Sequence, residues 1–251
     1  MGTVQYSITI EGETALISTA AELVVALDVL QGQHDRLVLQ QLQPHLAEIV
    51  GDPQGLYTTL KVLAPDDQLY LIDALGPRLV GVVQRAGALR DILATLADAR
   101  VEEQMVKTLG SDGLEALIGS VEDLAGVLEW VYGSCDQLVL QLLGTQFLKD
   151  IVQSGYELSL VLHSLDHARQ MELIEMLGWP RVQSLVHNLR DLAHLLRALP
   201  GELSTHLLTR FTRDPLWGLI RDDHGLRYLR RYLEADEAAC LDTLLEENDA
   251  E

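Results

Sequence analysis

Apolar residues return along this chain at steps of 33 to 35 residues. Five positions within that interval are apolar in each of six successive copies, and a Leu-Gly pair first seen at Leu75-Gly76 recurs three times at steps of 34. A period kept over so many positions is typical of stacked structural repeats. The copies begin near Thr19, Asp52, Ala86, Ser120, Ser154 and Asn188.

Within one copy the apolar spacing is helical. Leu56, Leu60 and Leu63 lie at i, i+4 and i+7, which is one stripe of an α-helix. A short polar break follows, and a second apolar stripe is interrupted at Gly76-Pro77, where Pro removes a backbone donor. We therefore predict an all-α chain, a right-handed α-solenoid of about six 34-residue two-helix repeats with the second helix kinked or split.

Polar residues at the expected helix starts share this period. Thr19-x-x-Glu22 and Ser154-x-x-Glu157 have the form of a capping box, and Ser120 and Asn188 begin near matches. Capping residues and apolar columns are different residue types. Their agreement on one interval supports the predicted repeat frame.

The two ends of the chain differ from the repeats. In residues 4–17, β-branched residues alternate with polar ones around a Gly-containing turn, which predicts a hairpin. We expect residues 1–18 to form an N-terminal hairpin or cap, 19–222 the repeat array, and 223–251 capping helices outside the period with an acidic tail. The hairpin either caps the array, as repeat arrays need, or recruits a partner.

Charge narrows the range of partners. The 251 residues carry a formal net charge of −20, so most of the surface repels nucleic acid and anionic membranes and attracts basic partners. Cys135 and Cys240 lie in no redox or metal motif, and no run of residues is apolar for long enough to span a membrane. The N-terminus has no signal-peptide pattern, so we expect a cytoplasmic protein.

No catalytic motif is present. The chain has no Walker loop, G-x-S-x-G, G-x-G-x-x-G or H-E-x-x-H, and we expect no enzyme activity, no catalytic residue and no cofactor. His163 and His167 are four residues apart and would share a helix face, as zinc ligands often do. A pair of solvated histidines at a helix end is the simpler interpretation, and no metal site is predicted.

The repeat resembles that of TAL effectors, the 34-residue repeats that read DNA. Glu22 to Leu27 and Leu39 to Leu46 carry the resemblance most closely, with Pro44, Pro77 and Pro180 near the kink. It implies two helices per repeat with a kinked second helix. DNA reading is not implied, because the loops between the helices have no recurrent Lys or Gly pair. The spacing is also similar to acidic helical repeats of MgtE-type magnesium channels and of the rotor protein FliG.

Three groups of residues are candidates for binding. Acidic residues at equivalent loops would line one edge of the array, and aromatic residues near loops or kinks would anchor a partner. Solvation of the acids and packing of the rings are the plain alternatives. These partner-binding candidates are Asp66, Asp67, Asp98, Asp166, Glu202, Trp130, Tyr132 and Trp179.

A basic cluster is the third group. Residues 206–232 hold six Arg and three Asp, while residues 233–251 hold eight acids and no base. The arginines either pair with these nearby acids or bind an anion. The anion-binding candidates are Arg210, Arg213, Arg227, Arg230 and Arg231.

The leading functional hypothesis is a non-catalytic protein–protein interaction scaffold or adaptor. Stacked repeats would present an acidic surface to a basic or amphipathic segment of a protein partner. The alternative is a nucleic-acid-binding repeat protein that uses the C-terminal Arg-rich region. No membrane association is expected, and the sequence leaves the oligomeric state open.

Overall fold

Helices form most of this protein, and a small antiparallel hairpin precedes them. The computed structural model describes residues 4–10, 12–30, 34–96, 98–131, 133–211 and 213–246, without the side chains of Glu13, Leu30, Arg213 and Asp214. Helices hold 77% of the residues, which confirms the mostly helical class and the N-terminal hairpin. Two compact units are present: unit 1 is Met1–Gly119 with Glu129–Leu143, and unit 2 is Ser120–Leu128 with Gly144–Glu251.

Unit 1 begins with the hairpin and continues with pairs of helices. Its elements are β1 (Tyr6–Ile10), β2 (Glu13–Ile17), α1 (Ala20–Leu30), α2 (Asp35–Leu42), η1 (Gln43–His45), α3 (Leu46–Val50), α4 (Pro53–Val62), α5 (Pro65–Leu75), η2 (Gly76–Arg78), α6 (Leu79–Val83), α7 (Ala86–Leu93) and α8 (Ala99–Leu117). The first part of α10 (Cys135–Ile151), up to Leu143, belongs to the same unit.

Unit 2 has the same alternation of helices. It contains α9 (Val121–Leu128), the end of α10, α11 (Gly155–His163), α12 (His167–Leu177), α13 (Trp179–Ser184), α14 (Leu189–Ala198), α15 (Gly201–Thr209), α16 (Arg213–Ile220), α17 (Asp223–Arg230) and α18 (Ala235–Glu246).

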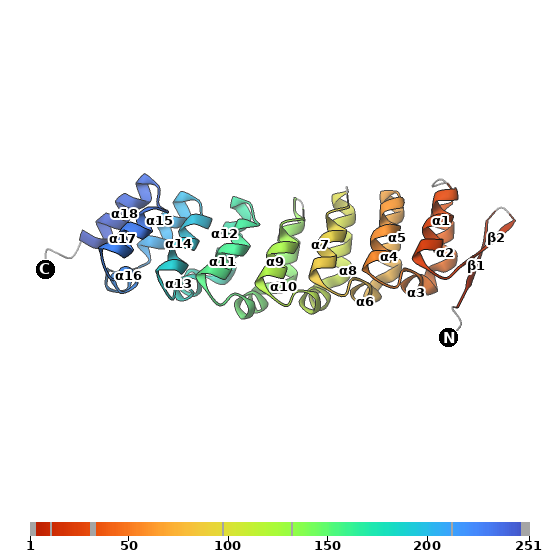
Figure 1. Ribbon diagram of the computed structural model, residues 1–251, viewed down its shortest axis with the longest axis horizontal. Coiled ribbons are helices and arrows are strands. Elements are labelled where there is room, and N and C mark those ends of the chain that lie inside the picture. Colours follow the sequence, from red (N-terminus) through yellow and green to blue (C-terminus); the bar gives the residue numbers. More distant parts are fainter. Residues whose placement is uncertain are drawn as a thin grey trace. The chain divides into compact units, whose positions relative to one another are not determined.

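Inside each unit, equivalent helices pack side by side. In unit 1, α1 contacts α4 and α4 contacts α7, while α2 contacts α5 and α5 contacts α8 (Figure 1). In unit 2, α9 contacts α11, α11 contacts α14 and α14 contacts α17. Leu23, Leu56 and Leu89 in unit 1, and Leu158 and Leu192 in unit 2, are fully buried at these contacts.

The recurrent Leu-Gly pair marks a backbone bend. Gly76, Gly110, Gly144 and Gly178 all have positive φ, from 50° to 78°, and Gly110 and Gly144 break the helical geometry inside α8 and α10. Glycine is favoured there because it has no Cβ to clash at positive φ. The second helix of a pair is thus bent or split, as the sequence predicts.

Helix starts follow the predicted capping pattern. The Glu22 amide donates to Thr19 Oγ1 at 3.3 Å, and the Ser18 amide donates to Glu22 Oε2 at 2.7 Å. Ser154 accepts from the Glu157 amide at 3.2 Å, and Asn188 accepts from the Asp191 amide at 3.0 Å. These bonds satisfy amides that a helix N-terminus otherwise leaves without a partner.

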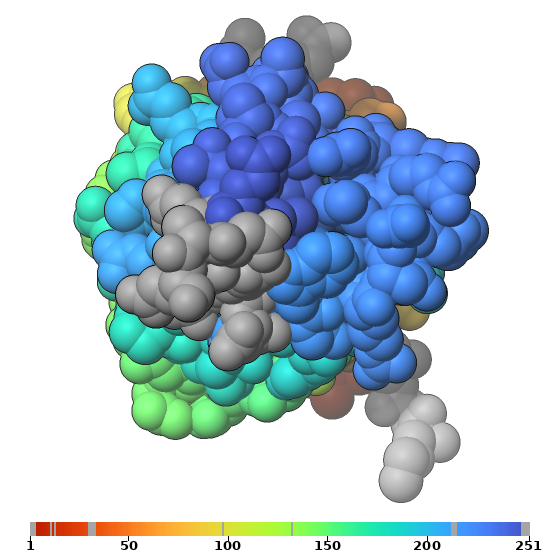
Figure 2. Space-filling view, turned by 90° about the vertical axis from the view of Figure 1, so that its left-hand side faces the viewer, coloured from red at the N-terminus to blue at the C-terminus, as the bar shows by residue number. Residues whose placement is uncertain are grey.

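A helix cap recurs once more at residue 222, where the sequence interpretation ended the repeats. Asp222 follows the cap Asn188 at the interval of the earlier copies, and it caps α17 by accepting from the Gly225 amide at 2.8 Å. The two helices expected after this point are α17 and α18. Figure 2 views unit 2 from this end, where the last helices appear in the darkest blues. The expected acidic tail at 247–251 lies outside the described residues.

The hairpin packs on the first helices. β1 contacts α2 and β2 contacts α1, and Ile8 and Ile17 are buried between hairpin and helices. The Tyr6 ring stacks on His45 with the ring centroids 4.0 Å apart. Apolar burial and ring stacking therefore hold the hairpin against the first helices of unit 1.

Candidate interaction surfaces

The acidic candidates lie where second helices begin. Asp98 caps α8 by accepting from the Arg100 amide at 2.9 Å, and Asp166 caps α12 by accepting from the Arg169 amide at 2.9 Å. Asp66 and Asp67 lie in the first turn of α5, and Glu202 lies in the first turn of α15. Negative charge at a helix N-terminus is stabilised by the helix dipole, which gives the recurrence of acids a local cause.

In unit 1 the acids lie close to arginines in the first turns of α2 and α8. Arg36 Nε is 2.7 Å from Asp67 Oδ1, and the Arg36 guanidinium also donates to the backbone oxygen of Asp66. Arg100 pairs with Asp98 at 2.8 Å and approaches Asp66 at 3.7 Å. Hydrogen bonds from Arg100 lower the pKa of Asp98, so this carboxylate stays ionised. Part of the negative charge is therefore compensated here.

In unit 2 the acidic candidates are more open. Asp166 and Glu202 are both exposed. The nearby Arg169 pairs with Glu172 of its own helix at 2.8 Å. The carboxylates of Asp166 and Glu202 are thus accessible from the surface.

The aromatic candidates have different surroundings. The Trp179 ring lies 4.6 Å from the His206 ring, and the Arg210 guanidinium lies 5.9 Å from the Trp179 centroid. Trp130 belongs to unit 1 and is 38% exposed. Tyr132 lies outside the described residues. Trp179 is thus part of a small cationic and aromatic cluster, while Trp130 is a surface side chain.

The arginine candidates do not form one cluster. Arg230 forms an ion pair with Asp242 of α18, and Arg227 Nε donates to the Asp223 backbone oxygen at 3.1 Å. Arg231 is exposed, and Arg210 belongs with Trp179. The Arg213 backbone lies in α16, but its side chain is outside the described part. Pairing with nearby acids, the plain alternative, holds for Arg230.

The two candidate histidines lie on different helices. His163 is the last residue of α11, and His167 is the first of α12. They do not share a helix face, because a turn separates the two helices. Within the described residues, no group of three or more His, Cys, Asp or Glu side chains is arranged to hold a metal ion.

Sequence reasoning missed a column of buried polar residues in the second helices. Gln170 shows its role: Nε2 donates to the Leu162 oxygen at 2.9 Å and lies 3.3 Å from the oxygens of Leu165 and Ala198. It thereby joins the C-terminal ends of α11 and α14. An alignment of the copies would reveal the column, which recurs at the repeat interval at Asp35, Gln68, Glu102, Asp136, Gln170, Ser204 and Glu237.

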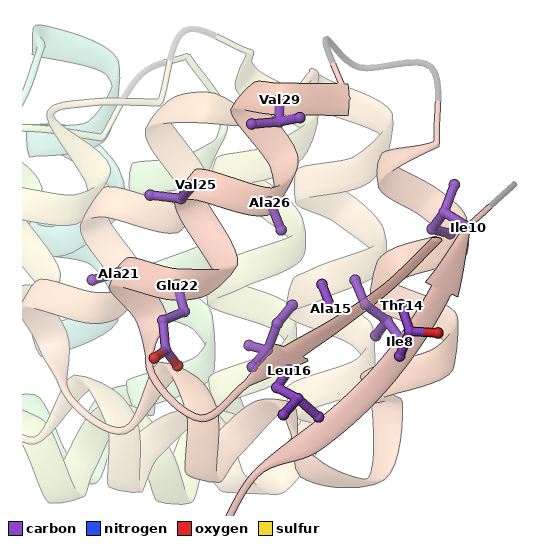
Figure 3. Close-up of a pocket in the computed structure, with 11 residues that line it drawn as sticks. Ile8, Ile10, Thr14, Ala15, Leu16, Ala21, Glu22, Val25, Ala26 and Val29 are labelled. Carbon is purple, nitrogen blue, oxygen red and sulfur yellow. The ribbon is translucent and has the colours of Figure 1, made fainter. Parts of the chain in front are cut away.

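Sequence reasoning also missed an apolar groove between the hairpin and α1. The groove has a volume of about 500 Å³ and is lined by side chains of β1, β2 and α1. Ala26 of α1 turns toward the hairpin, across from Ala15 (Figure 3). Leu16, Val25 and Val29 are 55%, 63% and 73% exposed. No sequence pattern marks the groove, because it depends on which apolar faces find no partner in the folded chain.

None of the helices in the described ranges combines the length and the apolar character that crossing a bilayer requires. No protein-family model matches the chain, and neither a curated protein nor a solved structure shows significant similarity to it.

Proposed function

We propose that the helix pairs form a right-handed α-solenoid of about six 34-residue repeats, with α17 and α18 as a shortened further copy. The side-by-side packing of equivalent helices within each unit supports this arrangement. So does the recurrence of the helix caps and of the glycine bends at the same interval. Repeats of this kind bury one continuous core and leave long exposed faces.

The function we propose is a cytoplasmic, non-catalytic scaffold that binds a basic or amphipathic segment of another protein. The observation that carries the proposal is the recurrence of acids at the starts of second helices in a chain of net charge −20. In a solenoid these starts would form one acidic edge, made of Asp66, Asp67, Asp98, Asp166 and Glu202. A cationic segment would be steered to this edge and held along it.

Nucleic-acid binding has weaker support. It would depend on the C-terminal arginines, yet Arg230 already pairs with Asp242. A chain with this net charge also repels phosphate backbones. An electrophoretic shift with duplex and single-stranded DNA and RNA at low salt tests this alternative directly.

The scaffold proposal is tested by salt-dependent retention of partners. Immobilised protein is exposed to native lysate at low and high salt, and the retained proteins are identified. A triple variant, Asp66→Asn with Asp166→Asn and Glu202→Gln, removes charge from the acidic edge while Asn still caps α12. We expect it to lose most of the partner that the unaltered protein retains at low salt.

A second triple variant separates the acidic edge from net charge. Asp112→Asn, Glu122→Gln and Glu175→Gln change three exposed acids at other positions, so the net charge is the same. We expect this variant to retain the partner. Equal retention by both variants, or retention that does not depend on salt, would contradict the proposal.

A further inference from the structure

The outer edges of the two hairpin strands differ in their hydrogen bonding. The Thr9 amide donates to Gln41 Oε1 at 2.9 Å, and Gln41 Nε2 donates to the Thr9 oxygen at 3.1 Å. A glutamine side chain thus occupies the outer edge of β1 at Thr9. The Thr9 donor and acceptor are therefore not available for pairing with another strand.

The edge of β2 has no such cover. Thr9 faces Thr14 in the register, and the Thr9 backbone bonds outward, so the Thr14 backbone N–H and oxygen must point to the opposite edge. The backbone N–H and oxygen of Leu16, two residues further along β2, point to the same edge. Within the described part of the chain no group bonds to these backbone atoms. β2 therefore offers a row of unused donors and acceptors.

The apolar groove lies along this open strand. Thr14 and Leu16 line it from β2, and Val25 and Val29 line it from α1 (Figure 3). Three of these side chains, Leu16, Val25 and Val29, are apolar and more than half exposed. An unpaired strand beside an apolar groove is the arrangement that binds extended peptides, since the backbone supplies affinity and the groove holds alternate side chains.

We propose that an extended segment of another protein adds to β2 as a third strand, with alternate apolar side chains in the groove and Lys or Arg residues flanking them. The flanking charges would meet Glu22 and Asp28, which are exposed on α1. This inference deepens the proposed scaffold function, on which it rests, by assigning a second binding element with its own recognition chemistry.

Charge decides between a foreign segment and a second copy of this chain. Two copies joined through β2 would bring together two molecules of net charge −20. Hydrogen bonds from Ser18 lower the pKa of Glu22, so that carboxylate remains ionised beside the groove. Like charges oppose self-association there, whereas a cationic segment gains from both carboxylates.

A synthetic peptide of alternating Val and Thr, with two lysines at each end, tests the proposal. We expect measurable binding by fluorescence anisotropy and slower hydrogen exchange at the Thr14 and Leu16 amides. The control peptide has the same sequence with backbone N-methyl groups on the residues that would pair with β2. It keeps charge and apolar surface but loses the donors, so we expect no binding. Equal binding of the methylated peptide would overturn strand addition.

Protein variants locate the site. Val25→Lys and Val29→Lys place positive charge in the groove at exposed positions, and we expect each to weaken binding of the cationic peptide about tenfold, or about 1.4 kcal/mol. Leu37→Lys, an equally large change at an exposed residue of α2 outside the groove, should leave binding unchanged. Unchanged binding by the groove variants would overturn the proposal, as would concentration-dependent dimerisation that these variants abolish.

The result also separates this inference from the scaffold function. If the peptide fails to bind while salt-dependent retention at the acidic edge persists, only the strand-addition proposal is wrong. If the peptide binds and the Asp66, Asp166 and Glu202 variant retains its partner, the acidic edge is wrong and the groove stands as a binding site.

Discussion

Single residues set the backbone shape of this chain. At Gly110, φ is 63° and ψ is −171°, a region that is almost exclusive to glycine. A Cβ at this position would meet no atom within 4 Å, so the strain of a larger residue comes from the backbone alone. The sequence signal, a Leu-Gly pair at a fixed interval, has this conformation as its cause.

Gly110→Ala tests that cause. We expect the free energy of unfolding to fall by about 1–3 kcal/mol, measured by urea denaturation. Gly87→Ala is the control, because Gly87 lies in α7 with open space around its Cα and no positive φ. We expect that change to be neutral or to stabilise by up to about 1 kcal/mol. Equal effects of the two changes would show that the bend carries no strain.

A buried carboxyl group makes the folding stability of this protein depend on pH. Asp35 is 2% exposed, and within the described residues its Oδ1 atom has no hydrogen-bond partner. Burial, together with the charge of Asp67, raises the pKa of Asp35. The folded state therefore holds this proton to a higher pH than the unfolded chain does, and stability is lost as the pH rises through the folded pKa.

Asp35→Asn should remove this loss. At pH 7 we expect a higher free energy of unfolding for the variant than for the unaltered protein. Below about pH 4, where Asp35 is protonated in both states, the two proteins should have the same stability. Denaturation curves at several pH values between 3 and about 7 provide the comparison. A variant that is less stable at pH 7 would contradict the assignment.

At the scale of elements, buried polar side chains join one helix to the next. Gln170 donates to carbonyl oxygens at the ends of both α11 and α14. Ser204 donates to Glu237, a bond between side chains that joins α15 to α18. Helix C-termini have carbonyl groups without an intrahelical partner, so the Gln170 contacts satisfy acceptors that packing would otherwise bury.

Gln170→Ala should therefore be costly. We expect the free energy of unfolding to fall by about 1–3 kcal/mol, because buried carbonyl oxygens would remain unpaired. Gln146→Ala is the comparison, since Gln146 is exposed on α10 and, among the described residues, its side chain bonds to Asp150 on the same helix. Its effect should stay within about 0.5 kcal/mol. Stability is measured by thermal or urea unfolding. A similarly small effect for Gln170→Ala would contradict the stabilising role of the buried polar column.

The elements were predictable because their signals are local. Apolar spacing located the helix pairs, the Leu-Gly interval located the bends, and alternation of β-branched residues located the hairpin. The register of Asp222 with Asn188 was missed, although Leu226 and Leu233 also follow Leu192 and Leu199 after 34 residues.

The surfaces were less predictable because they depend on packing between copies. Arg36 of α2 pairs with Asp67 of α5, which lies 31 residues further along the chain, and no pattern within one copy shows this pair. His163 and His167 have the spacing of one helix face, but the chain ends a helix between them. The groove beside β2 forms where apolar side chains of β2 and α1 are left uncovered by the rest of the described chain. A sequence alone does not show which apolar faces stay uncovered.

At the scale of the molecule, the proposed acidic edge requires one particular arrangement of the helix pairs. The acidic edge exists as a continuous surface only if the helix pairs stack in one series, so that equivalent loops lie next to one another. Each unit has this packing internally. The net charge of −20 would then act along an extended face instead of being spread over a globule.

Small-angle X-ray scattering of the purified chain tests this arrangement most directly. A compact domain of this length has a radius of gyration of about 18 Å. We expect a value clearly above that, with a pair-distance distribution that has a long tail, as an elongated array requires. A radius of gyration equal to that of a compact domain, with a symmetric distribution, would contradict the stacked repeats and the acidic edge that they would form.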